Sequence, residues 1–178
     1  MLGAHISIVR AALLVALAAL LEATLSPLLA LGWVAPHFLM IGLIVAVTGM
    51  RDLQGLLLGF FGGVLTDALS GGIFGTGTLG GVLAAAVGVR AGALRRKGGT
   101  GTLMAQGVAA SVAVYDLLNL FAASLVGRGG PDASGYLSGF ADYLITGVVP
   151  DVLLNAVLAY LVGGHILRAI TKREEIWN

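Results

Sequence analysis

Long apolar runs, separated by short segments that hold most of the polar residues, set the pattern of this chain. A helix needs about 20 apolar residues to cross a bilayer, and several of the runs have about this length. The pattern predicts six transmembrane helices within a single domain of residues 1–178. Their approximate bounds are 6–28, 36–50, 53–70, 74–94, 102–126 and 150–168. The predicted fold class is therefore an all-α polytopic membrane protein.

The last apolar region is longer than one span requires and has Pro150 near its middle. Proline disrupts the interior of a helix but is well tolerated in its first turn. We therefore predict that the sixth helix begins at Pro150. Residues 136–148, which are amphipathic, are predicted to form a separate helix at the membrane interface.

Composition supports a membrane protein. Hydrophobic residues make up 58% of the chain and charged residues only 11%, with a mean hydropathy of +0.99, whereas soluble domains carry about a quarter charged residues. The chain has no cysteine and three scattered histidines, so we expect no metal site, no cofactor and no thiol chemistry. A net charge of +1 without a basic patch gives no indication of nucleic-acid binding.

Basic residues indicate the topology, because lysine and arginine in short loops stay in the cytoplasm. With six spans, all but one of these residues fall on one side of the membrane: Arg10, Arg51, Arg90, Arg95, Arg96, Lys97, Arg168, Lys172 and Arg173. Arg128 falls on the other side. Both termini are therefore expected in the cytoplasm, and the protein in the cell inner membrane. The basic segment at 95–97 can also attract anionic membrane lipids.

The predicted third helix carries a small or acidic residue at every fourth position: Gly55, Gly59, Gly63, Asp67 and Gly71. Stripes of small residues let helix backbones approach closely in a membrane. The fourth helix has a similar row of Gly80, Ala84, Gly88 and Gly92, and a glycine-rich turn joins the two helices. We expect them to form a close hairpin. The stripe either packs the protein's own helices or receives a partner helix.

Asp67 lies at the end of the predicted third helix, near the membrane surface. An acid deep in the bilayer is costly, whereas one near the surface can accept hydrogen bonds from the glycine-rich turn or cap the next helix. A structural role is the first interpretation. Contact with a partner is the second, and ion or proton handling is the third.

The other acids of the predicted spans have simpler interpretations. Asp151 is expected to cap the sixth helix, and Asn155, one turn further, to hydrogen-bond across helices. Glu22 and Asp116 lie deeper and are the candidates for a proton or substrate path. A relay also needs a basic partner, and the arginines in the spans lie near the cytoplasmic face. The glycine-rich segments lack the Lys-Ser/Thr of a phosphate-binding loop, so no catalytic site is predicted.

Three segments resemble the MreD family of rod shape-determining membrane proteins. They are PHFLMIGLIVAV, opened by a proline; LLLGFFGGVLTDALSGGIFGTGTL, with the pattern G-F-x-x-G-x-x-x-D-x-x-S-G-x-x-x-G; and VVPDVLLNAVLAYLV, with P-x-x-x-x-N. The matching positions are Pro36, Gly59, Phe60, Gly63, Asp67, Ser70, Gly71, Gly75, Pro150 and Asn155. The family often has an acid after the first proline, where this chain has His37.

The resemblance implies a non-enzymatic scaffold subunit of the bacterial rod complex, which supports lateral peptidoglycan synthesis and cell shape. The implied partners are MreC and, through the assembly, actin-like MreB, a RodA-type glycosyltransferase and a class B penicillin-binding protein. We predict that the transmembrane helix of MreC docks on the outside of the bundle and that its extracellular part meets loops 26–36, 70–76 and 127–149. The family is similar in fold to the S components of energy-coupling-factor vitamin transporters. A substrate-binding S component, or another small-solute transporter, is therefore the alternative function.

Overall fold

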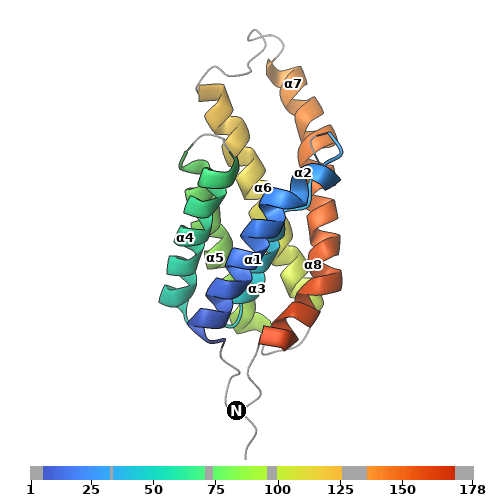
Figure 1. The fold of residues 1–178 in the computed structure, drawn as a ribbon. Coiled ribbons are helices and arrows are strands. Elements are labelled where there is room, and N and C mark those ends of the chain that lie inside the picture. Colours follow the sequence, from blue (N-terminus) through green and yellow to red (C-terminus); the bar gives the residue numbers. More distant parts are fainter. Residues whose placement is uncertain (1–5, 33, 71–73, 96–99, 126–135, 171–178) are drawn as a thin grey trace, which may run out of the picture.

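The computed structural model describes residues 6–32, 34–70, 74–95, 100–125 and 136–170, and these fold as helices with short connections. Figure 1 shows the long helices side by side in one bundle. In chain order, the elements are α1 (Ile8–Thr24), α2 (Ser26–Leu29), α3 (Phe38–Val47), α4 (Asp52–Ser70), α5 (Thr76–Arg95), α6 (Thr100–Leu125), α7 (Tyr136–Tyr143), the π-helical η1 (Leu144–Val148) and α8 (Val149–Ile170).

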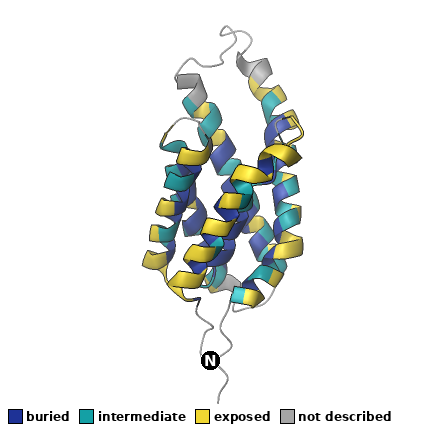
Figure 2. Cartoon of the chain, viewed as in Figure 1, coloured by how far each residue is buried: buried dark blue, intermediate teal, exposed yellow. Residues whose placement is uncertain are grey.

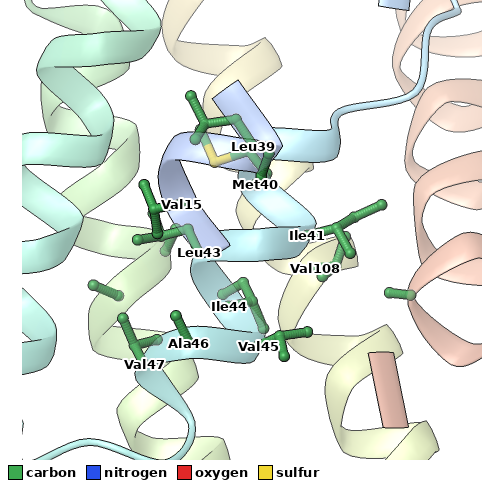
Figure 3. Close-up of a cluster of buried hydrophobic side chains, with 14 of the residues drawn as sticks. Val15, Leu39, Met40, Ile41, Leu43, Ile44, Val45, Ala46, Val47 and Val108 are labelled. Atoms are coloured by element: carbon green, nitrogen blue, oxygen red, sulfur yellow. The ribbon is translucent and has the colours of Figure 1, made fainter. Parts of the chain in front are cut away.

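The core of the bundle is built around α3. This helix is apolar on every side, and all its residues from Leu39 to Val47 are buried. A helix without a polar face is stable only when other elements surround it, and α1, α4, α5, α6 and α8 all contact α3. Figure 3 shows this core, to which α1 contributes Val15 and α6 contributes Val108. Although α3 is short, it lies at the centre of the bundle and packs against all these helices.

Apolar side chains also lie on the outside of the bundle, and Figure 2 shows where the exposed residues lie along its helices. Exposed leucine and phenylalanine on several helices are expected where lipid replaces water. Among the described residues, three helical segments are long and apolar enough to cross a membrane, and they are Asp52–Leu69, Gly101–Ala122 and Phe140–Ile170. The fold is therefore all-helical, with three membrane-length apolar helices and several shorter ones.

The helices lie close to the segments predicted from the apolar runs, with two differences at the first half of the chain. The segment predicted as one helix over 6–28 ends at Thr24, and the separate short α2 follows with Pro27 in its first turn. The helix predicted over 36–50 is limited to Phe38–Val47. His37, which precedes its first residue, has a ψ of 73° and therefore lies outside the helical range.

The chain does not break before Pro150. Residues from Tyr136 to Ile170 are continuously helical, and the five-residue π-helical segment η1 joins α7 to α8. In η1, the amide of Val149 donates to the carbonyl of Leu144, one residue further back than in an α-helix. The wider turn lies where the proline ring would otherwise clash with the preceding turn. α8 thus begins within one residue of the predicted start at Pro150, but it continues α7 and η1 instead of starting a separate helix.

Candidate functional site

Asp67 binds the start of the next helix. Its Oδ1 accepts the amide of Gly77 at 2.7 Å. Its Oδ2 accepts the amides of Gly75 at 3.0 Å and Thr78 at 2.9 Å, and the Thr78 hydroxyl at 2.6 Å. The first amides of a helix have no partner within the helix, and its positive end favours an anion. The hydrogen bonds expected between Asp67 and the glycine-rich turn are thus present, and the side chain is buried.

Glycines allow α4 and α5 to approach at backbone distance. A Cβ on Gly63 would lie 2.6 Å from the Cα of Thr78, and one on Gly59 would lie 2.6 Å from the carbonyl oxygen of Gly81. Gly55, one turn earlier, faces the Val89 side chain instead. Any side chain at Gly59 or Gly63 would therefore meet main-chain atoms of α5. In this structure, that face of α4 is occupied by the protein's own helix.

The row predicted on the fourth helix faces other neighbours. The α5 glycines against α4 are Gly77 and Gly81, whereas a Cβ on Gly80 would meet Tyr115 of α6 and one on Gly88 would meet Val47 of α3. The expected hairpin forms, but the row of Gly80, Ala84, Gly88 and Gly92 is not its contact surface. Small residues occur on two adjacent sides of α5. The two rows are offset by a single position in the sequence, so the sequence does not show which row faces α4.

The remaining predicted residues of this hairpin have different locations. Phe60 points outward and is 44% exposed, with its ring 5.5 Å from that of Phe61 in an edge contact. Ser70 is the last residue of α4, and Gly75 adopts the left-handed backbone conformation, with φ of 104°. Gly71 lies outside the described residues.

A second group of polar residues joins helices that are distant in sequence. This histidine cluster consists of Glu22 in α1, His37 before α3, Asp116 in α6, and Asp151 and Asn155 in α8. Asp151 and Asn155 are almost completely buried, and Asp116 is also classed as buried. Buried polar groups are costly unless they are paired, so their mutual contacts decide whether this part of the bundle is stable.

Main-chain groups on both sides of Pro36 bind to α8. The amide of Ala35 donates to Asp151 Oδ1 at 2.7 Å, and the amide of His37 donates to Asn155 Oδ1 at 2.6 Å. The Asn155 amide group donates in turn to the carbonyl of Ala35 at 3.0 Å. Pro36 has no amide proton, so α8 satisfies the polar groups that surround it. These hydrogen bonds, which we call the Pro36 clamp, bring the predicted residues Pro36 and Asn155 together.

The imidazole of His37 lies between two carboxylates. Its Nδ1 is 3.2 Å from Glu22 Oε1, and its Nε2 is 2.9 Å from Asp151 Oδ2. The other oxygen of Glu22 accepts the amide of Leu39 at 3.1 Å. The ring of Tyr115 also meets the imidazole edge to face, with centroids 5.7 Å apart. The histidine thus links α1 and α8 through the segment that begins α3.

Asp116 completes the group. One ligand atom from each of His37, Asp116 and Asp151 lies within 4.8 Å of the other two. Glu22 and Asp116, the two acids predicted as candidates for a proton or substrate path, lie here in one cluster, and His37 is the basic group beside them. Asp151 was expected to cap its own helix, but its carboxylate is directed at Ala35 and His37. That prediction is wrong because η1 and α8 are continuous, so the helix has no free start there.

Comparison with known proteins gives one match. The family model described as rod shape-determining protein MreD matches residues 4–127, more than two thirds of the chain. The match includes Glu22, His37, Asp67 and Asp116, whereas α8 with Asp151 and Asn155 lies beyond it. No curated protein and no solved structure matches the chain.

Proposed function

The chain belongs to the MreD family of rod shape-determining membrane proteins, and from this premise we propose that it is a non-enzymatic scaffold of the rod complex. In this role it binds MreC and supports lateral peptidoglycan synthesis. The observation that carries the proposal is the family match over most of the chain. The polar groups support it, since Asp67 and Asn155 both bind main-chain groups of the protein itself, which stabilises a fixed shape.

We propose that the bundle crosses the inner membrane six times, with both termini in the cytoplasm. The three apolar helices of membrane length support part of this arrangement. The distribution of basic residues supports the rest, because nine of the ten fall on one side when six spans are counted. Asp67 and the histidine cluster then lie toward the periplasmic end.

The outward face of α4 is the proposed docking surface for the transmembrane helix of MreC. Gly59 and Gly63 are in contact with α5, so a partner helix would meet the side chains on the opposite side. There Leu57, Phe60 and Phe61 are exposed. Aromatic side chains bury a large area for little loss of conformational freedom, and they are suited to packing against a second helix.

Contacts with the other partners are proposed to pass through MreC. Its extracellular part would meet loops 26–36, 70–76 and 127–149, parts of which lie outside the described residues. Actin-like MreB, a RodA-type glycosyltransferase and a class B penicillin-binding protein would then join the same assembly. Membrane lipids would cover the remaining apolar surface.

Co-purification from detergent tests the proposal. The full chain is expected to retain MreC, and the double variant Phe60→Ala/Phe61→Ala to retain about tenfold less, which corresponds to about 1.4 kcal/mol of binding free energy. The matched control is Leu153→Ala/Leu161→Ala, which removes exposed side chains from α8 instead.

Two results would contradict different parts of the proposal. Equal MreC recovery with a folded phenylalanine variant would exclude α4 as the docking face. If the unaltered chain retains no MreC and instead contains a stoichiometric vitamin by mass spectrometry, the scaffold role is wrong and the transporter S component replaces it.

A further inference from the structure

We propose that His37, Asp116 and Asp151 form a binding site for a divalent first-row transition metal ion such as Zn²⁺. The three residues come from the segment before α3, from α6 and from α8, and one ligand atom of each lies within 4.8 Å of the others. An imidazole with two carboxylates is a donor set that suits Zn²⁺, Mn²⁺ or Fe²⁺. The inference is independent of the proposed partners, because it rests on side-chain geometry alone.

Asp151 provides the strongest indication of a bound cation. The residue is 2% exposed, and its Oδ1 accepts the amide of Ala35. Its Oδ2 is buried and has no hydrogen-bond partner among the described residues, although it lies 2.9 Å from His37 Nε2. Neighbouring ligands at about 2.1 Å from a metal ion are about 3.0 Å apart in octahedral and about 3.4 Å apart in tetrahedral coordination, so this spacing is closest to that of two octahedral ligands of one ion.

Glu22 gives His37 the environment of a metal ligand. A histidine that binds a metal through one ring nitrogen usually donates a proton from the other to a carboxylate or carbonyl. Here Nδ1 is 3.2 Å from Glu22 Oε1, and the other oxygen of Glu22 is held by the amide of Leu39. A proton on Nδ1 leaves the lone pair of Nε2 directed at Asp151. Glu22 is therefore a positioning residue and not a ligand.

The charge of the cluster also requires compensation. Glu22, Asp116 and Asp151 are three carboxylates, and the nearest basic group of the described cluster is the single imidazole of His37. A carboxylate removed from water is destabilised unless a cation or several donors accompany it. A divalent ion bound to a neutral imidazole would provide two positive charges at the point where the carboxylates converge.

Metal titration of the purified full chain in detergent tests the site. After treatment with a chelator, the protein is expected to bind one equivalent of Zn²⁺ by elemental analysis and one of Co²⁺, with the visible absorption of a protein-bound Co²⁺ ion. Bound Zn²⁺ should also raise the temperature of unfolding, because the ion binds only the folded state.

Three variants and two controls make the result specific. Asp116→Asn and His37→Gln remove ligands and should abolish the Co²⁺ absorption, and Glu22→Gln should weaken Zn²⁺ binding about 10- to 100-fold. The controls His165→Gln and Asp142→Asn alter exposed residues away from the cluster, and these variants should bind the metal as the original does.

The proposal is overturned if the unaltered protein binds no stoichiometric metal, a result that does not depend on any variant folding. It is also overturned if Asp116→Asn, shown to be folded by circular dichroism, binds Zn²⁺ with unchanged affinity. If the unaltered protein binds the metal but not MreC, only the proposed function is contradicted. The metal site and the proposed function can therefore fail separately.

Discussion

Replacing Asp67 should separate the contribution of a single carboxylate oxygen from that of the whole side chain. The two oxygens have unequal roles, because Oδ1 accepts the amide of Gly77 and Oδ2 accepts two amides and a hydroxyl. In Asp67→Asn, the remaining oxygen can keep the three hydrogen bonds of Oδ2. The new amide group would then face the Gly77 amide, and two donors would lie opposite each other. In Asp67→Ala, all four hydrogen bonds are lost.

The expected magnitudes follow from these contacts. A hydrogen bond to a charged group contributes about 1.5 to 3 kcal/mol, and a buried donor without a partner costs about 1 to 3 kcal/mol. We expect Asp67→Asn to lower the free energy of unfolding by about 2 kcal/mol. Asp67→Ala should lower it by about 4 to 6 kcal/mol, which is less than the sum of four separate bonds because the contributions are not additive.

Equilibrium unfolding of the purified chain in mixed detergent micelles, followed by circular dichroism, measures both values. Asp142→Asn is the matched control, since Asp142 is exposed, and it should unfold as the original does. If the asparagine and alanine variants both stay within about 0.5 kcal/mol of the original, the Asp67 cap does not stabilise the hairpin and the reasoning is refuted.

Two further substitutions test the close contacts of the fold. Gly63→Ala should destabilise the protein by about 1 to 3 kcal/mol in the same assay, because its methyl group would lie 2.6 Å from the Cα of Thr78. Gly164→Ala, where no atom lies within 4 Å of the added Cβ, should be neutral or slightly stabilising, and equal effects of the two would contradict the packing argument. Asn155→Ala removes hydrogen bonds to His37 and Ala35. It should lower the free energy of unfolding by about 2 to 4 kcal/mol, and the midpoint of thermal unfolding should fall with it. An unchanged midpoint would show that the Pro36 clamp contributes nothing to stability.

The sequence predicts the hairpin of α4 and α5 well because its determinants are local. Asp67 is only eight to eleven residues from its hydrogen-bond donors, and the glycines between them allow a tight turn. Small residues every fourth position on α4 indicate a close helix contact. The side of α5 that makes the contact could not be predicted, because glycines occur on more than one side of that helix.

The histidine cluster was not predictable in the same way. Its members lie on different helices, and the hydrogen bonds from Ala35 and His37 to α8 join residues 116 and 118 positions apart. Spacing along the chain contains no information about which faces of distant helices meet. The sequence therefore gives no indication that Glu22, Asp116 and Asp151 meet at His37. The continuous helix through Pro150 was missed for a related reason, since a π-helical turn is rare and has no simple sequence signal.

The two polar groups differ in when they can form during synthesis. The Asp67 hydrogen bonds close within a loop of about ten residues, so the α4 and α5 hairpin can assemble as soon as its second helix has left the ribosome. The Pro36 clamp must wait until α8, near the end of the chain, has been made. Until then Glu22 and His37 remain without Asp151. A chain whose synthesis stops after α6 would therefore keep the hairpin of α4 and α5 but lack the hydrogen bonds from Ala35 and His37 to α8, so the segment before α3 is held in place only when the last helix has been made.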